Sequence, residues 1–370
     1  MKTFLIVTII ITGVVFPISN LQIGQYNGDR IDCSGYDDNS FMFYACDSIH
    51  NKIIQSPKYT DYRYYITPDS NDIVRFDSLL ANYSNSDDEI INSSLLDSLG
   101  YTYTDILFSD FDDTLRIFHE INTWGEDNTE DYKKGWGIYI QNLQAERDGI
   151  IIEVNHPLND KDTDFIGAKL FQELNAEWLF VAGAHRYAWV DSTIYCDDDT
   201  TDFNCGADVA DSSSSKTIFQ VFHENISNES TIFISIHGFD NDFHLFEDTG
   251  LVISNGEDSN GSPVEPNNLT RSFKHQYDIQ FEQQNLCPEN DTSSVIVFDA
   301  NTSYFSLAGG KNPQGNYTNI NYPGKWVQLE TDSCTRYHSD NFIESIKYVF
   351  SGLQPNPQII SIDDVPDDQG

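Results

Sequence analysis

Positively charged residues are scarce in this sequence, in which 20 Lys and Arg stand against 59 Asp and Glu among 370 residues, giving a net charge of −39. A surface this acidic repels the phosphates of nucleic acids and of anionic lipids, so neither is expected as an unassisted partner. Cysteine is scarce too, and none of the six lies in a C-x-x-C pattern, which argues against a thiolate zinc site or a redox pair. Apolar residues make up 39% of the chain, enough to form a folded core.

Long apolar runs are lacking after the first 20 residues, so we expect no membrane-spanning helix beyond that point. Before it, Lys2 precedes an apolar run over 4–15 that Pro17 ends, and this run is shorter than the roughly 20 residues that a spanning helix needs. The pattern predicts a secretory signal over 1–20, cut near Ser19 or Asn20, with an uncleaved anchor as the alternative. We therefore expect a secreted, extracellular protein that leaves the membrane once the signal is removed.

The even number of cysteines fits a disulfide framework, which is typical of exported proteins. Of about 15 possible connectivities, chain order favours the pairs Cys33–Cys46, Cys196–Cys205 and Cys287–Cys334. The Asn-x-Ser/Thr sequons of the chain predict a glycoprotein if the source is a eukaryote, whereas in an Asn-rich bacterial chain they would be chance. They include the sequons at Asn82, Asn92, Asn225, Asn228, Asn268, Asn290, Asn301 and Asn316.

The chain divides by composition into four parts: the signal over 1–20, an irregular N-terminal region over 21–110, a main domain over 111–353 and a mobile acidic tail over 354–370. In the main domain, buried apolar strands alternate with helices. We expect strands at 137–142, 149–154, 178–183, 231–236, 251–254, 294–299 and 326–330, and helices at 163–175, 216–224 and 339–350. This alternation predicts an α/β fold in three layers, with a mixed or mostly parallel sheet flanked by helices.

Histidines follow the ends of three predicted strands. His156 and Asp160 come after 149–154, His185 comes after 178–183, and His237 comes after 231–236. Ligands of such sheets bind beyond the carboxyl ends of the strands. A histidine, a carboxylate four residues on and a distant histidine make a suitable set of three zinc ligands that leaves a fourth position for water. The sequence therefore predicts a catalytic Zn²⁺ site, since the metal brings the pKa of that water towards about 7.

The stretch 153–186 resembles the N-formylglutamate amidohydrolase-like proteins of the zinc carboxypeptidase and amidase group. The shared features are a strand ending in E-V-x-H-P, an Asp soon after it, a helix, and a strand closing in G-x-H-R. Residues 235–238 resemble the strand end that supplies the group's last zinc ligand, and 324–336 its late strand with a catalytic Glu followed by an Arg. Residues 310–319 resemble a substrate loop of related secreted proteins. The resemblance covers roughly 135–350 and implies the zinc-exopeptidase/phosphorylase-hydrolase-like α/β fold.

The resemblance implies His156, Asp160 and His237 as zinc ligands and Glu330 as general base and acid. It further implies a substrate-binding set of His185, Arg186, Asn312 and Arg336, in which Arg186 or Arg336 holds a substrate carboxylate. The activity implied is cleavage of an amide or peptide C–N bond in a small or carboxylate-bearing substrate. The sequence departs from the family at Asp160, where a Glu is usual, and Glu153 competes with it as the carboxylate ligand.

Two other functions stay open. The segment 106–115, ILFSDFDDTL, resembles the first motif of haloacid-dehalogenase-type phosphatases, with Asp110 as nucleophile, Asp112 as acid/base and Mg²⁺ as cofactor. That chemistry also needs a lysine and a late acidic pair, and we find neither well placed in the sequence. The other possibility is a secreted binding protein that has the same fold without catalysis, which metal content would distinguish from the enzyme.

Overall fold

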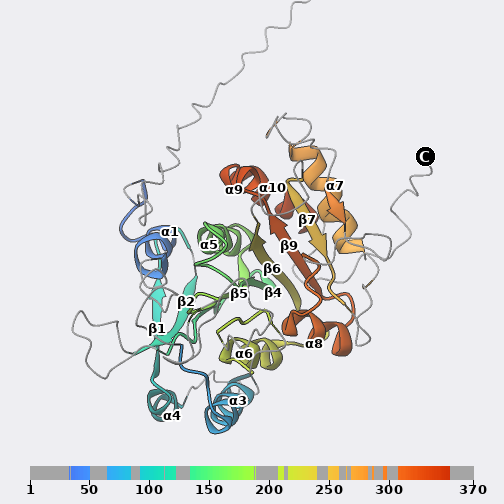
Figure 1. Cartoon of the computed structure of the whole chain (residues 1–370). Coiled ribbons are helices and arrows are strands. Elements are labelled where there is room, and N and C mark those ends of the chain that lie inside the picture. Colours follow the sequence, from blue (N-terminus) through green and yellow to red (C-terminus); the bar gives the residue numbers. More distant parts are fainter. Residues whose placement is uncertain are drawn as a thin grey trace, which may run out of the picture.

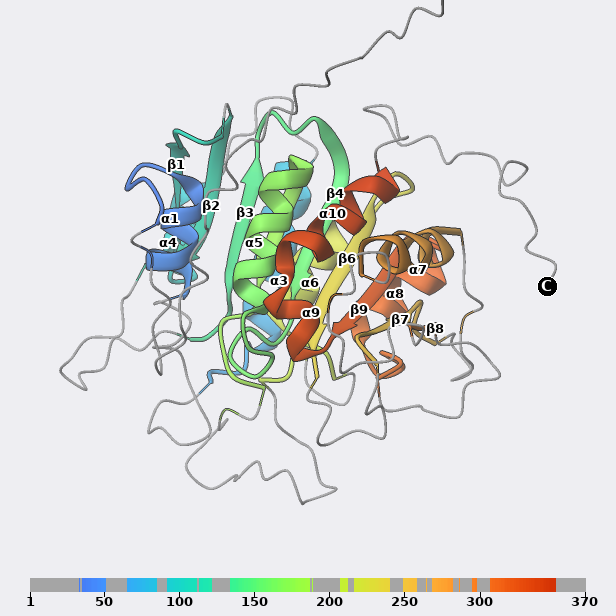
Figure 2. The same cartoon turned by 90° about the horizontal axis from the view of Figure 1, so that it is seen from above.

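The structure is a computed structural model of the chain (Figures 1 and 2). It describes residues 35–50, 65–84, 92–111, 113–121, 134–186, 207–211, 216–239, 249–257, 268–281, 295–297 and 307–350, together with residues 33, 188, 264 and 286. The predicted signal over 1–20 and the predicted tail over 354–370 lie outside the described residues.

A mixed sheet of nine strands runs through the described part of the chain, in the order β1-β2-β3-β5-β4-β6-β9-β7-β8. Its four central strands, β5, β4, β6 and β9, are parallel, whereas β1, β2, β3 and β7 pair antiparallel with their inner neighbours. The predicted mixed sheet is therefore confirmed. The strands are β1 (Tyr101–Leu107), β2 (Thr114–Glu120), β3 (Ile138–Asn142), β4 (Arg147–Val154), β5 (Ala176–Val181), β6 (Ile232–Gly238), β7 (Leu251–Ser254), β8 (Ile296–Val297) and β9 (Trp326–Thr331).

Helices cover both faces of the sheet, so the predicted three layers are confirmed. One hydrophobic core includes residues of α1, α5, α7 and α10, and the other includes residues of α3, α4 and α6. Figure 1 shows α5 and α6 on opposite sides of the sheet, and Figure 2 shows α5 and α10 lying over one face. The helical segments are α1 (Phe41–Tyr44), the π-helical η1 (Ala45–His50), α3 (Ser70–Ser84), α4 (Ser93–Ser98), α5 (Thr163–Leu174), α6 (Ile218–Ile226), α7 (Asn268–Phe281), α8 (Pro313–Asn321), α9 (Ser333–Tyr337) and α10 (Ser339–Phe350).

The central strands are buried on both faces. On β4, Ile152 and Val154 belong to the core under α5, whereas Ile151 belongs to the core under α6, because successive side chains of a strand point to opposite faces. Parallel strands covered by helices on both sides read as continuous apolar runs. The strand at 149–154 could therefore be predicted from its apolar run. The loop after Val154 follows the carboxyl end of β4 and so lies at the edge where the parallel central strands end.

The sheet begins before the predicted domain start at residue 111. Within the region expected to be irregular, residues 70–84 form α3, residues 93–98 form α4 and residues 101–107 form the edge strand β1. β1 is partly exposed and rich in Thr and Tyr, so it lacks the continuous apolar run of the central strands. In α3, Phe76, Leu80 and Tyr83 are buried at helical spacing. That spacing is the signal that could have predicted this helix.

A disulfide bond joins Cys33 to Cys46, with the two Cα atoms 5.8 Å apart, so this predicted pair is confirmed. Cys334 is also disulfide-bonded. Cys196, Cys205 and Cys287 lie outside the described residues, and the two pairs predicted for them stay predictions. In the part of the chain that the structure describes, no helix combines the length and apolar character that crossing a membrane requires.

Replacing both Cys33 and Cys46 by Ser should lower the free energy of unfolding by about 3 kcal/mol. The bond closes a loop with a sequence separation of 13 residues, and opening it restores the loop's freedom to the unfolded chain. Urea unfolding of the double variant and of the unchanged protein measures the difference. The double variant is preferable to a reducing agent, which would also break the bond at Cys334. A loss below about 0.5 kcal/mol would contradict the prediction.

Candidate metal centre

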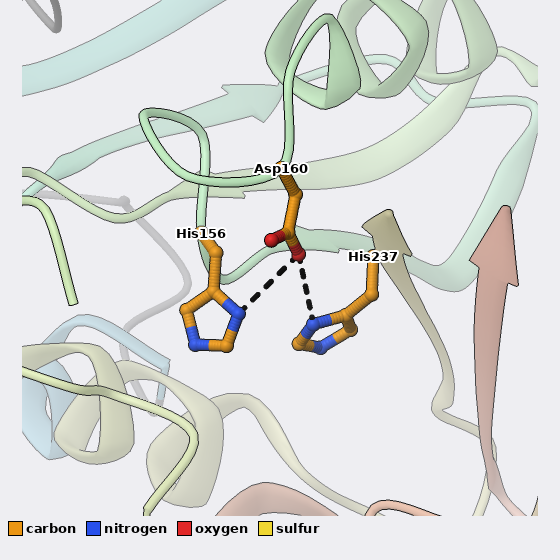
Figure 3. A group of neighbouring side chains, drawn as sticks. All are labelled: His156, Asp160 and His237. Carbon is orange, nitrogen blue, oxygen red and sulfur yellow. Dashed lines mark ion pairs between the residues drawn. The ribbon is translucent and has the colours of Figure 1, made fainter. Parts of the chain in front are cut away.

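Two histidines and an aspartate meet at the carboxyl edge of the central strands. His156 and Asp160 lie in the loop between β4 and α5, and His237 lies near the end of β6. One potential ligand atom from each of the three lies within 4.8 Å of the others, and all three residues are buried. Figure 3 shows the Asp160 carboxylate between the two imidazoles. The structure therefore brings together the three residues predicted as ligands, in a group that could hold a metal ion.

The spacing of this group fits tetrahedral coordination. Oδ2 of Asp160 lies 3.3 Å from Nδ1 of His156 and 3.3 Å from Nδ1 of His237. Ligands bound about 2.1 Å from one tetrahedral ion are about 3.4 Å apart. In addition, Nδ1 of His156 is buried and makes no hydrogen bond within the described chain. A cation between these atoms would provide the partner that this nitrogen lacks.

Backbone geometry sets the position of Asp160. The loop after β4 turns back at once, since the Asp160 N–H donates to the His156 carbonyl at 2.8 Å. The Asp160 carboxylate also accepts the N–H of Gly238, at 3.1 Å. A Cβ atom at position 238 would lie 2.6 Å from Nη1 of Arg336, closer than real Cβ contacts. A glycine directly after His237 therefore lets this strand end approach both Asp160 and Arg336.

Asp208 is a second carboxylate that contacts the ring of His156. Its Oδ1 lies 2.9 Å from Nε2 of His156, and its Oδ2 lies 2.9 Å from Nη2 of Arg186. When Nε2 carries a proton for Asp208, a neutral imidazole presents the lone pair of Nδ1 towards Asp160. Asp208 was not predicted from the sequence. No signal singled it out, because it follows a stretch crowded with other aspartates.

Charges inside the group stabilise one another. Burial and Arg186 disfavour a proton on His156, but Asp208 and Asp160 outweigh them and raise the pKa of His156 to about 9. Burial opposes a charge on Asp160, yet His156 and His237 hold the pKa of that carboxyl well below its ordinary value. A metal cation would take over the role of the proton on His156, so metal and proton compete for this site.

Glu330 lies beside the group. It is on β9, directly opposite His237 on β6, with Oε1 4.0 Å from Nδ1 of His237. Burial, and next the charge of Asp160, raise the pKa of Glu330 to about 8. Gln328 donates from Nε2 to Oε1 of Glu330 at 2.6 Å. Gln328 was not predicted from the sequence, although side chains two residues apart on a strand lie on the same face.

The predicted substrate-binding residues each have other contacts. Arg186 pairs with Asp208, and Arg336 donates to the backbone carbonyls of Thr331 and Phe239. Asn312 caps the start of α8, where its Oδ1 accepts the N–H groups of Gln314 and Gly315. His185 is buried in the loop after β5. Their role towards a substrate, including the holding of a carboxylate by either arginine, stays a prediction.

Glu153, the alternative carboxylate ligand, lies away from the group. On β4 it alternates with Val154 and points to the α6 side of the sheet. There Oε1 lies 2.7 Å from Nδ1 of His223, and Nε2 of that histidine lies 2.8 Å from Oγ1 of Thr318. Glu153, His223 and Thr318 are fully buried. The structure therefore favours Asp160 over Glu153 as the carboxylate beside the two histidines.

Asp110, the predicted nucleophile of the phosphatase alternative, accepts hydrogen bonds from the first backbone N–H groups of α1. Its Oδ1 accepts the N–H of Phe41 at 2.5 Å, its Oδ2 accepts the N–H of Met42 at 3.4 Å, and Gln172 donates to Oδ2 at 2.8 Å. These hydrogen bonds give Asp110 a structural role that needs no catalytic function. Asp112 lies outside the described residues.

No protein-family model matches the sequence, and no curated protein matches it. Solved structures similar to the chain include YNDL in a zinc-free apo form, at 11% identity over 60% of this chain and 93% of that chain, with a TM-score of 0.35. A bacteriophage poly-gamma-glutamate hydrolase is 12% identical over 58% and 88%, with a TM-score of 0.30. A succinylglutamate desuccinalase from Vibrio parahaemolyticus is 12% identical over 74% and 85%, with a TM-score of 0.34.

Two of these structures are named as a hydrolase and a desuccinalase. At TM-scores between 0.30 and 0.35, the likeness is too slight to assign a family or a function to this chain.

Proposed function

We propose that the protein is a zinc-dependent hydrolase that cleaves an amide or peptide C–N bond in a small molecule or a peptide. The observation that carries the proposal is the convergence of His156, Asp160 and His237 within 4.8 Å, with the Glu330 carboxylate 4.0 Å from His237. Two imidazoles and one carboxylate are a common ligand set for catalytic zinc, which polarises a carbonyl and brings the pKa of water towards about 7.

The residues around the ligands have distinct roles in this reaction. Glu330 is placed to take a proton from the attacking water and to deliver it later to the leaving nitrogen. Its pKa, raised by burial to about 8, suits a group that must both accept and release a proton near neutral pH. Gln328 holds Oε1 of Glu330 by a hydrogen bond, and Asp208 fixes the ring of His156 by the bond to Nε2.

We also propose that the protein works outside the cell. The disulfides at Cys33–Cys46 and at Cys334 support this, because such bonds persist in oxidising compartments. Expression with and without residues 1–20, followed by measurement of the protein in the culture medium, tests export. Equal amounts in the medium from both forms would contradict it.

The function is tested by zinc content and by hydrolysis together. Purified protein loaded with Zn²⁺ is expected to hold about one ion per chain and to hydrolyse members of a panel of N-acyl amino acids and dipeptides. Removal of the metal with a chelator should abolish the activity, and added Zn²⁺ should restore it. A stably folded protein that takes up no zinc would contradict the proposal and would favour the binding protein instead.

Asp208→Asn should weaken zinc binding by about 10- to 100-fold. The amide loses the charge that Asp208 places beside Nε2 of His156, so the imidazole is held less well and is a poorer ligand. Competition with a chelating dye measures the dissociation constant for zinc. Asp97→Asn, at an exposed position on α4, is the matched control. Equal zinc affinity in both variants would show that Asp208 does not support the ligand.

A further inference from the structure

The residue directly before the first predicted ligand is a buried asparagine. Asn155 is 1% exposed. Its Oδ1 accepts a hydrogen bond from Oγ of Ser235 at 2.8 Å, and its Nδ2 donates to Oε1 of Gln314 at 3.1 Å. Burying polar groups costs free energy unless they are hydrogen-bonded, and these two bonds supply that compensation. Asn155 therefore ties the start of the ligand loop to β6 and to α8.

The bond to Ser235 continues the pairing of β4 with β6 beyond the backbone ladder. On β4 that ladder ends with Val154. Ser235 lies two residues before His237 and therefore on the same face of β6, and Asn155 directly precedes His156. The side-chain bond thus joins the two strands at the point where each of them leads into a predicted ligand.

The carboxamide of Gln314 also reaches the other side of His156. Its Nε2 donates to the Val209 carbonyl at 2.9 Å and to Oε1 of Gln220 at 2.8 Å. Val209 directly follows Asp208, whose Oδ1 lies 2.9 Å from Nε2 of His156. One side chain therefore contacts both the residue before this histidine and the segment that carries the partner of its ring.

The start of α8 fixes the position of Gln314. Oδ1 of Asn312 accepts the N–H groups of Gln314 and Gly315 in the first turn. A Cβ atom at position 315 would lie 2.9 Å from the ring of Trp326 on β9, so this turn packs directly on the sheet. The carboxamide of Gln314 is fully buried and makes three hydrogen bonds. This residue of the predicted substrate loop over 310–319 is therefore placed to hold protein groups rather than a substrate.

We propose that Gln314 is a positioning residue that fixes the ring of His156 from two sides. Its oxygen holds Asn155, which precedes that histidine, and its nitrogen holds the segment 207–211, which carries Asp208. Partners of this kind set the orientation of a metal ligand and so the affinity for the metal. The purpose, which is to orient a zinc ligand, rests on the proposed hydrolase function, whereas the holding of 207–211 does not.

Zinc affinity tests the proposal with Gln314→Met, which has nearly the same length but makes none of these hydrogen bonds. The full chain should bind Zn²⁺ about tenfold more weakly, measured by competition with a chelating dye. In the Asp208→Asn background the same substitution should weaken binding by less than about threefold, because both changes loosen one ring. Gln172→Met is the matched control, since this glutamine of α5 donates to Asp110 and should leave zinc binding unchanged.

A Co²⁺-loaded sample separates a change at the ligand from a general loss of stability. At saturating Co²⁺, Gln314→Met should shift the visible absorption of the bound ion, because the bands depend on coordination geometry, whereas Gln172→Met should not. Unchanged zinc affinity, an unchanged spectrum, or losses that multiply in full with Asp208→Asn would each overturn the proposal. If Gln314→Met does not fold, Gln314→Asn, which shortens the side chain by one methylene, takes its place under the same criteria.

Hydrogen exchange in the metal-free protein distinguishes this inference from the hydrolase function. The Ala210 N–H donates to Oδ1 of Asp208 at 2.9 Å, so its exchange rate reports how firmly the segment 207–211 is held. It should exchange about tenfold faster in Gln314→Met than in the unchanged protein or in Gln172→Met. Equal rates would overturn the positioning role. Faster exchange in a protein that takes up no zinc would count against the hydrolase function and leave the holding of 207–211 by Gln314 standing.

Discussion

Glu330→Gln should lower kcat by about 10²- to 10⁴-fold while the protein keeps its zinc, because it removes the group that moves the proton and leaves the predicted ligands intact. Glutamine has almost the same shape, so the buried space next to Gln328 stays filled. Glu330 is not one of the three residues whose ligand atoms converge. The loss should therefore appear in kcat, with little change in the affinity for zinc.

The measurement uses the member of the amide panel that the unchanged protein hydrolyses fastest, together with metal analysis of each sample. Glu344→Gln is the matched control, because Glu344 is a partly exposed carboxylate on α10 that pairs with Lys347. An unchanged kcat in Glu330→Gln would mean that another group moves the proton. Loss of zinc from this variant would place Glu330 among the ligands and would require a different base.

His237→Ala should reduce bound zinc from about one ion per chain to none, and with it abolish hydrolysis. The variant leaves only His156 and Asp160 of the three converging residues, too few for a tight site. A ligand that binds only the folded state stabilises it by about 4 kcal/mol when its free concentration is 1,000 times the dissociation constant. The unchanged protein should therefore show a higher Tm with Zn²⁺, whereas the variant should show none of this increase.

Thermal unfolding with and without Zn²⁺, combined with metal analysis, measures both effects. His275→Ala removes an exposed histidine on α7 and serves as the control. If His237→Ala bound zinc as tightly as the unchanged protein, the proposed centre would be in the wrong place. If neither protein responded to zinc, the convergence of His156, Asp160 and His237 would have another cause.

The central strands of the sheet could be predicted from the sequence because both of their faces are buried. The strand expected at 231–236 is β6 (Ile232–Gly238), and the helix expected at 339–350 is α10 (Ser339–Phe350). Strands of this kind are visible as apolar runs, and the loops that follow them are where sites form. The edge strand β1 could not be seen in the same way, since its partly exposed sequence resembles a loop.

The candidate site was predictable only in part, for a related reason. Strand-end position singled out His156 and His237, and strand alternation could have rejected Glu153, which shares the face of Ile151 rather than that of Val154. Asp208 could not be recognised as a site residue, because nothing in the sequence distinguishes it from the other members of a set of 59 acidic residues. Its contact with His156 spans 52 positions of the chain, so it depends on the folded structure.

Asp208 has a consequence for how His156 and Arg186 depend on each other. One of its oxygens contacts the ring of His156, and the other contacts Arg186. Because one carboxylate joins the imidazole to the guanidinium, loss of the Arg186 side chain would loosen the carboxylate and with it the ring of His156. The affinity for an ion would then depend on an arginine that is not among the three converging residues.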